Sequence, residues 1–447
     1  MRIALIAMSG IRVVDTELLE MGLTLPGFVE RSKTIASLPS LGLLTLAALT
    51  PEEHEVDYIE VEDIRHLDHL PSDFDLVGIS SFSAQIGEAY ALADGFRAMG
   101  TPVVLGGLHV TSLPAEAMLH SDAIVIGEGE PVWAELVRDA ANGTLKPVYD
   151  GRTCAYDLED APLPAYDLLD IERYNRLTVQ TSRGCPHRCE FCASSILLTE
   201  GYMQKPIDLV LREIDAIKAL WKHPFIEFAD DNAFINHRYW KTLLPQLAER
   251  HVRWFAETDL SVAKDPELLD MMRESGCAQV LIGLESPVPT GLDGLELHNN
   301  WKRKRYDEYR SAIDAIQSRG ISVNGCFVLG LDGHTSDVFD EVIDFVQESG
   351  LLEVQVTILT PFPGTPLYDR LSREGRLLYP GEWNRCTLFD LNFQPSDMSV
   401  EELQHGFRRM ASVLYGDEMT AERRARFKSI LRSIQTERAA PALGGVA

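Results

Sequence analysis

Apolar segments alternate with amphipathic segments along the first 150 residues. Apolar runs stand at 2–7, 54–61, 75–82, 102–107 and 123–129. The segments between them carry apolar residues at helical spacing, as residues 87–100 do. Apolar strands joined by helices imply a parallel sheet that helices cover on both faces. The pattern therefore predicts a doubly wound, Rossmann-like α/β domain over residues 1–150.

A second alternating region follows. Residues 151–175 lack a period and contain the proline-rich stretch APLP, so we interpret them as a linker. From 176 to 365 six strand–helix units predict a partial (β/α)6, TIM-like barrel with function at the carboxyl ends of its strands. Its expected strands are 176–182, 225–231, 252–257, 279–285, 322–330 and 353–360. Residues 366–447 predict a small helical C-terminal region that ends in a disordered tail, AAPALGGVA.

Polar and glycine-rich turns follow the strands of the first domain. Ser81 ends the third expected strand, Gly106 and Gly107 end the fourth, and Gly127 lies at the end of the fifth. Ligands of doubly wound sheets bind at the carboxyl ends of the strands. These turns therefore predict a ligand-binding edge.

Composition narrows the class of protein. The 447 residues carry a formal net charge of −27, which argues against nucleic acid as a main partner. We find no apolar stretch of the roughly 18 residues that a transmembrane helix needs. The first residues, MRIALIAMSG, lack the form of a signal peptide. Three of the seven cysteines lie within eight residues, unlike a secreted disulfide framework, so we expect a cytoplasmic protein.

Those three cysteines form the strongest chemical signal in the chain. In TSRGCPHRCEFCASS (181–195), Cys185, Cys189 and Cys192 have the spacing C-x3-C-x2-C. Thiolates hold iron–sulfur clusters, and three ligands leave one iron of a [4Fe-4S] cluster open for another molecule, as in catalytic zinc sites. Phe191 lies between two of the ligands, where it can shield the cluster and contact an adenine.

Other interpretations of the motif are weaker. A zinc site usually has a second pair of ligands, and we find none, although His187 within the loop is a possible fourth ligand. Chance clustering is a further alternative. A non-catalytic iron–sulfur electron carrier is a third, but it does not explain three clustered cysteines within an expected barrel.

The motif resembles that of the radical S-adenosylmethionine superfamily. Further segments resemble its cobalamin-linked branch: EFADDNAFIN (227–236), IGLES (282–286), FVLGLDGHT (327–335) and LTPFPGTPLYD (359–369). The resemblance implies that the open iron binds S-adenosylmethionine and that the cluster cleaves it to a 5′-deoxyadenosyl radical. It also implies cofactor contacts for Asp230, Asp231 and Glu285, although the two aspartates could instead cap the next helix. The chain departs from the pattern at His334, where relatives carry Glu, and at Pro287-Val288-Pro289.

Residues 1–150 resemble a cobalamin-binding domain in ISSFSAQ (79–85), GGLHVTSLP (106–114) and IGEGE (126–130). The resemblance implies cobalamin contacts from Ser81, Gly106, Gly107, His109 and Gly127. The Asp-x-His-x-x-Gly motif that supplies a cobalt ligand in cobalamin mutases is absent, and His109 is the remaining candidate. The alternative is a flavodoxin-like domain without a ligand.

Together these resemblances imply a radical enzyme that methylates an unactivated carbon of a small-molecule metabolite. The alternative is a cobalamin-linked radical cyclase, rearrangement or oxidation enzyme acting on a tetrapyrrole-like or lipid-like substrate. We expect an electron donor such as flavodoxin or ferredoxin, and we expect the two cofactor sites to face one cavity. No residue of the sequence is assigned a catalytic role. The basic segment 422–435 has the spacing of an amphipathic helix.

Overall fold

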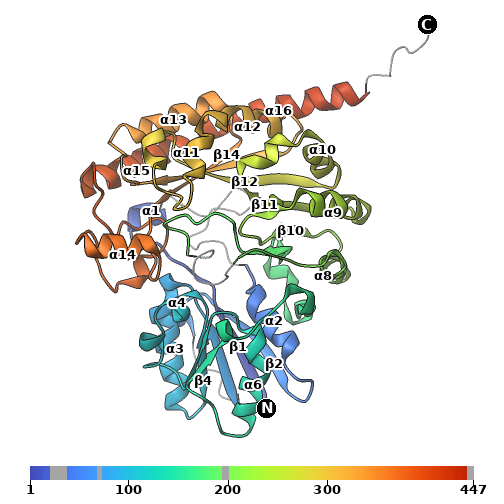
Figure 1. Ribbon diagram of the computed structural model, residues 1–447, viewed down its shortest axis with the longest axis vertical. Coiled ribbons are helices and arrows are strands. Elements are labelled where there is room, and N and C mark those ends of the chain that lie inside the picture. Colours follow the sequence, from blue (N-terminus) through green and yellow to red (C-terminus); the bar gives the residue numbers. More distant parts are fainter. Residues whose placement is uncertain (21–37, 68–72, 194–200, 440–447) are drawn as a thin grey trace. The chain divides into compact units, whose positions relative to one another are not determined.

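The structure is a computed structural model, coloured along the chain in Figure 1, that describes residues 1–20, 38–67, 73–193 and 201–439. These residues form two compact units. The first unit contains residues up to 231 together with 359–394, and the second contains 232–358 and 395–439.

The first unit opens with the predicted doubly wound sheet. Its strands follow the order β2-β1-β3-β4-β5-β6, and every pairing is parallel. The order reverses between β1 and β3, which is the switch point where such sheets bind ligands. The strands are β1 (Arg2–Met8), β2 (Glu55–Val61), β3 (Leu76–Ser80), β4 (Val103–Gly106), β5 (Ala123–Ile126) and β6 (Val148–Asp150). β6 is a strand that the hydrophobic pattern did not predict.

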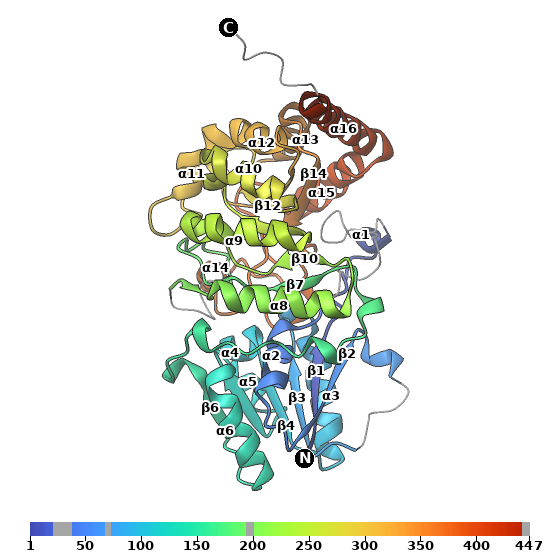
Figure 2. The same cartoon turned by 90° about the vertical axis from the view of Figure 1, so that its right-hand side faces the viewer.

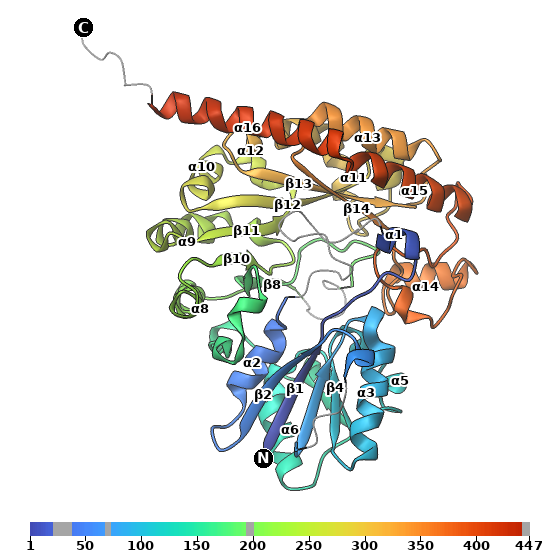
Figure 3. The same ribbon diagram turned by 180° about the vertical axis from the view of Figure 1, so that it is seen from behind.

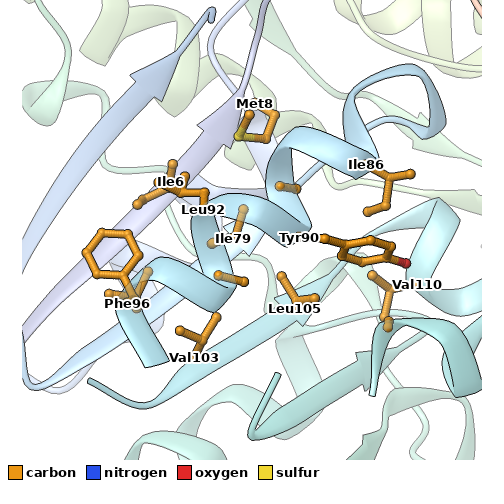
Figure 4. Packing of buried hydrophobic residues seen from close by; sticks show 14 of the residues in the cluster. Ile6, Met8, Ile79, Ile86, Tyr90, Leu92, Phe96, Val103, Leu105 and Val110 are labelled. Atoms are coloured by element: carbon orange, nitrogen blue, oxygen red, sulfur yellow. The ribbon is translucent and has the colours of Figure 1, made fainter. Parts of the chain in front are cut away.

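Both faces of this sheet are buried by helices. Ile6 of β1 packs under α3 (Ile86–Ala98) with Ile79 and Leu105, as Figure 4 shows. Leu5 points to the opposite face, where α2 (Leu41–Leu49) and α6 (Glu130–Ala141) contribute apolar side chains. Figure 3 shows α2 and α3 on opposite sides of the strands. Because successive side chains of a strand alternate between faces, burial on both faces requires the nearly continuous apolar runs of the sequence.

A second parallel sheet has the order β14-β13-β12-β11-β10-β7, and it remains open in the part of the chain that the structure describes. Its pairings that have a resolved register are parallel. Six strands in an open sheet with helices between them confirm the predicted partial barrel. The strands are β7 (Leu177–Val179), β10 (Phe225–Phe228), β11 (Arg253–Thr258), β12 (Cys277–Glu285), β13 (Ser322–Leu329) and β14 (Glu353–Ile358).

Helices of the second unit cover the outer face of β11–β14. Figure 2 shows them side by side in chain order: α9 (His237–Arg250), α10 (Pro266–Glu274), α12 (Tyr309–Gln317) and α13 (Val338–Ser349). Trp254 of β11 stacks on Trp240 of α9, and Phe327 of β13 meets Phe345 of α13 edge to face. These contacts place the odd-numbered residues of β13 against the helices. Its even-numbered residues therefore face the concave side.

The regions outside the two sheets agree with the sequence in part. Residues 151–175 form single 3₁₀ turns, and the buried Leu158 and Tyr166 show that this linker is packed. The C-terminal region contains the predicted helices α14 (Pro366–Arg373), α15 (Val400–Leu414) and α16 (Asp417–Ala439). Between α14 and α15, however, the chain has one 3₁₀ turn (Trp383–Arg385) and an isolated bridge. Apart from Ala439, the predicted disordered tail lies outside the described residues.

A search of the described helices finds none that is both long enough and apolar enough to cross a bilayer. The domain limits predicted at residues 150, 175 and 365 stay predictions.

Candidate functional site

The cysteine loop leaves the second sheet through a two-residue strand, β8 (Ser182–Arg183), that pairs antiparallel with β9 (Met203–Gln204). Gly184 then turns the chain with a φ of 86°, a conformation that favours glycine. Of the three cysteines, Cys189 is buried, while Cys185 and Cys192 are partly exposed. The amide of Cys192 donates to the Cys189 carbonyl at 3.1 Å. This hydrogen bond closes a turn between the second and third cysteines of the loop.

Two carboxylates from the end of β10 hold the beginning of this loop. Asp230 accepts hydrogen bonds from the amides of Thr181 (2.7 Å) and Ser182 (2.8 Å), and from the Thr181 hydroxyl. Asp231 accepts from the Gly184 amide at 2.9 Å. Burial raises the pKa of Asp230 to about 6, although its hydrogen bonds act in the opposite direction. The structure therefore gives Asp230 a clear role in positioning the loop.

The far side of the loop is fixed by α14. Arg370 makes a forked ion pair with Glu190, with its Nε 2.5 Å from Oε1 and its Nη2 2.9 Å from Oε2. The amide of Leu367 donates to the Glu190 carbonyl at 3.1 Å. Phe191, the next residue, is partly buried. A segment 180 residues away in sequence therefore holds the loop between its second and third cysteines.

A cavity of about 510 Å³ lies within the first unit, at the carboxyl edge of the N-terminal sheet. Gly106, Gly107 and Gly127 line it. Gly107 has a φ of 103°, and a Cβ added there would lie 3.2 Å from the Ser80 hydroxyl. A Cβ on Gly127 would lie 2.6 Å from Cγ of Arg152. The glycines therefore shape this edge by the absence of side chains.

The cavity extends along the sheet face that α2 and α6 cover. Its apolar wall consists of Leu5, Leu43, Leu46, Val104, Val125 and Trp133. Volumes of this size, with an apolar interior and a few polar groups, are typical of small-molecule and cofactor sites.

Polar groups from two parts of the chain meet at the cavity. Arg183, from the cysteine loop, donates to Glu128 at 2.9 Å and to Glu130 at 2.8 Å. Burial acts to lower the pKa of Arg183, but the two carboxylates outweigh it and hold the pKa above its ordinary value. Lys205 also lines the cavity and pairs with the buried Glu213 at 2.6 Å. The cavity thus joins the N-terminal sheet edge to the beginning of the cysteine loop.

Two of the residues that the sequence predicts to contact cobalamin do not line this cavity. Ser81 is buried, and its hydroxyl donates to the Phe82 carbonyl at 2.9 Å. His109 is 1% exposed, with Nδ1 3.0 Å from the Ser83 hydroxyl and Nε2 3.3 Å from a carboxylate oxygen of Glu116. Burial lowers the pKa of His109. Its nitrogens are committed within the protein, so the geometry does not bring His109 to the ligand edge.

Glu285 lies in the second unit, at the end of β12, in the left-handed region with a φ of 64°. Its carboxylate pairs with Lys302 at 2.7 Å, and Lys302 also donates to the Gly283 carbonyl at 3.0 Å. The next residue, Ser286, is 2.9 Å from Nε2 of the buried His334. Burial lowers the pKa of His334 to about 4, so this imidazole is neutral at physiological pH.

Comparison with known proteins shows which protein family the chain belongs to. Residues 179–346 match the radical SAM superfamily, 33–137 match the B12 binding domain, and 365–444 match a domain of unknown function. An uncharacterized methyltransferase of Synechocystis sp. is 30% identical, over 80% of this chain and 67% of that protein. The chain belongs to the cobalamin-binding radical S-adenosylmethionine enzymes. Bacteriochlorophyllide d C-12(1)-methyltransferase of Chlorobaculum tepidum is a further relative of this radical enzyme, 29% identical over 85% of this chain and 83% of the relative.

The fold of this radical enzyme has a solved counterpart. The radical S-adenosylmethionine methyltransferase TsrM of Kitasatospora setae, with cobalamin and a [4Fe-4S] cluster bound, superposes with a TM-score of 0.63. The match covers 85% of this chain and 79% of TsrM at 17% identity. It confirms the fold predicted from the sequence.

The cysteine loop of the radical enzyme fits a [4Fe-4S] cluster by its donors. Thiolates are the ligands of such clusters. Among the described residues no three His, Cys, Asp or Glu side chains converge on a single ion. A four-iron cluster does not require such convergence, because each thiolate binds a different iron. Three thiols on one short loop, fixed at both ends, suit that requirement.

The residues that line the cavity of the radical enzyme are of the kinds that suit a large flat cofactor. Glycines form its rim and an apolar wall lies behind them. The Tyr156 hydroxyl is buried and has no hydrogen-bond partner in the described part of the chain. An unpaired buried hydroxyl is costly, so a ligand with an acceptor group here is favoured. Cobalamin, with its corrin amides, supplies such groups.

Sequence reasoning missed Arg183, Lys205, Tyr156 and Lys302. A signal for Arg183 existed, since the basic residue precedes the cysteine motif and IGEGE supplies two carboxylates at a predicted ligand edge. Nothing in the sequence says that these two segments meet. Lys302 stands in the basic run WKRKR, where solvent exposure is the ordinary expectation.

Proposed function

We propose that this enzyme is a C-methyltransferase that uses a [4Fe-4S] cluster, S-adenosylmethionine and cobalamin to methylate an unactivated carbon of a small-molecule substrate. The observation that carries the proposal is the shared lining of the cavity. Gly106, Gly107 and Gly127 come from the sheet edge, while Arg183 and Asp231 come from the segments that hold the cysteine loop. The relatives with methyltransferase names support the same reaction class.

Methylation of an unactivated carbon requires two reactive groups beside one substrate. When bound, the cluster with S-adenosylmethionine supplies hydrogen abstraction and cobalamin supplies a methyl group. Asp230 and Asp231 hold the first turn of the cysteine loop by its amides. Leu5 and Trp133 contribute an apolar wall to the adjacent cavity, and a bound cofactor that covers this wall would displace water from it. Proximity and dryness favour transfer over quenching by solvent.

Glu285 is a proposed contact to S-adenosylmethionine. Lys302 neutralises its charge and orients the carboxylate through a short ion pair, so Lys302 is a positioning residue for this contact. Phe191 is proposed to cover the cluster between its second and third ligands. We further propose that flavodoxin or ferredoxin supplies the electrons, in the cytoplasm.

A half-reaction tests the proposal without knowledge of the substrate. The full chain is reconstituted anaerobically with iron and sulfide, loaded with cobalamin and reduced, and S-adenosylmethionine with a deuterated methyl group is added. We expect S-adenosylhomocysteine in stoichiometric amount before any substrate is present, and its loss when cobalamin is omitted. With a productive substrate, 5′-deoxyadenosine and S-adenosylhomocysteine should form in step. Formation of 5′-deoxyadenosine alone would refute methylation and favour a cyclase or rearrangement enzyme.

A further inference from the structure

The side chain of Arg183 lies between the two proposed cofactor sites. It lies two residues before Cys185, and its side chain is 19% exposed. Its guanidinium reaches across the cavity lining to Glu128 (2.9 Å) and Glu130 (2.8 Å), and it also donates to Gln180 at 3.1 Å. The side chain therefore connects the turn that begins the cysteine loop to the turn that follows β5.

The turn after β5 depends on this cation. Glu128 and Glu130 flank Gly129, and all three line the cavity with Gly127. Two partly buried carboxylates so close in sequence repel one another unless a cation lies between them. The fork of an arginine matches two carboxylate oxygens and fixes their geometry better than an ammonium group. The shape of the cavity rim and the direction of Arg183 are therefore set together.

We propose that Arg183 is a positioning residue that couples occupation of the cavity by cobalamin to assembly of the iron–sulfur cluster. A cluster bound by Cys185 fixes the loop and with it Arg183, which holds Glu128 and Glu130 in the arrangement that shapes the cavity. Coupling between two sites is reciprocal, so cobalamin in the cavity also favours the loop conformation that binds the cluster. The inference rests on the cofactors of the proposed function.

The chain offers a matched control on the other side of the same loop. Arg370 also donates two hydrogen bonds, both to the carboxylate of Glu190, and this pair likewise lies within the first unit. Neither residue lines the cavity. Loosening the loop at Arg370 therefore tests general damage to the cluster site, whereas a change at Arg183 tests the connection to the cavity.

The test is a binding cycle on the full chain with hydroxocobalamin as the probe. Its apparent Kd is measured by absorbance for iron-free protein and for cluster-reconstituted protein, in the wild type, Arg183→Gln and Arg370→Gln. We expect the wild type to bind cobalamin about fivefold or more tightly with the cluster present, the lower range of typical coupling. The ratio should fall to about one in Arg183→Gln and stay at the wild-type value in Arg370→Gln. Because each variant's Kd with the cluster is divided by its own Kd without the cluster, any direct effect of Arg183 on cobalamin binding cancels.

Several results would overturn the inference. A wild-type ratio of one, or an unchanged ratio in Arg183→Gln, removes it directly. If Arg183→Gln does not fold, Arg183→Lys and Glu130→Gln take its place, because each loses the fork and keeps the length of the side chain. Wild-type protein that takes up no cobalamin at all refutes the proposed function as well. Cobalamin uptake with unchanged coupling refutes the role of Arg183 alone.

Discussion

Replacing Asp230 by asparagine removes a buried charge while keeping its shape. The carboxylate is 3% exposed, and Oδ1 accepts the amides of Thr181 and Ser182 while Oδ2 accepts the Thr181 hydroxyl. An asparagine can keep all three contacts. Its carbonyl oxygen accepts both amides, and its NH₂ group donates to the hydroxyl, which reverses its role.

The size of the effect follows from the pKa. Burial raises the pKa of Asp230 from 3.8 to about 6, and each pH unit corresponds to about 1.4 kcal/mol. The ionised carboxylate therefore costs the folded chain about 3 kcal/mol relative to its protonated form. Since the folded state holds the Asp230 proton to a higher pH than the unfolded state, the contribution of Asp230 to wild-type stability falls as pH rises from about 4 to 6. Asp230→Asn lacks this loss, so we expect its advantage to grow by about 3 kcal/mol over that window and then remain constant.

Denaturant unfolding of iron-free protein at pH 4.0, 6.0 and 7.5 measures the difference. Asp230→Asn should also retain iron on reconstitution, because the loop keeps its anchors. Asp230→Ala leaves two buried amides without an acceptor, at about 1–3 kcal/mol each, and should lose both stability and iron. The reasoning is refuted if Asp230→Asn is the less stable protein at pH 7.5, or if the difference does not depend on pH. Loss of S-adenosylmethionine binding with normal iron would instead assign Asp230 to the cofactor.

Three further predictions concern the cofactors. Gly107→Val should abolish cobalamin uptake with iron content unchanged. As a control, Gly143→Val should bind cobalamin normally, because Gly143 has a similarly positive φ of 68° but open space around it. Equal uptake by both variants would contradict the placement of the corrin. Tyr156→Phe should weaken cobalamin binding about 2- to 10-fold, from the 0.5–1.5 kcal/mol of one hydrogen bond, and leave the empty protein as stable as before; an unchanged Kd would show that the hydroxyl has no ligand. Changing all three loop cysteines to Ala should abolish iron binding while cobalamin still binds, and stoichiometric iron and sulfide in that variant would disprove the cluster site.

Local sequence patterns predicted much of the candidate site. The spacing of Cys185, Cys189 and Cys192 specifies a loop with three soft ligands, and such spacing needs no tertiary information. The glycines at 106, 107 and 127 predicted a ligand edge, and all three line the cavity. His109 shows the limit of the same reasoning. A polar residue next to a predicted edge can equally face inward, and here its ring is buried against Ser83 and Glu116.

The sequence by itself determined most strands of the two large sheets, their parallel direction within two α/β regions and the chemistry of the cysteine loop, because alternation and short spacings are properties of neighbouring residues. Tertiary structure alone decided which distant groups meet. Arg183 and Glu128 are 55 residues apart, and Glu190 and Arg370 are 180 apart. Ion pairs of this kind depend on how whole helices and strands pack. The pattern of charges along the chain does not contain that information. The connection between the proposed cofactor sites therefore became visible only in the folded chain.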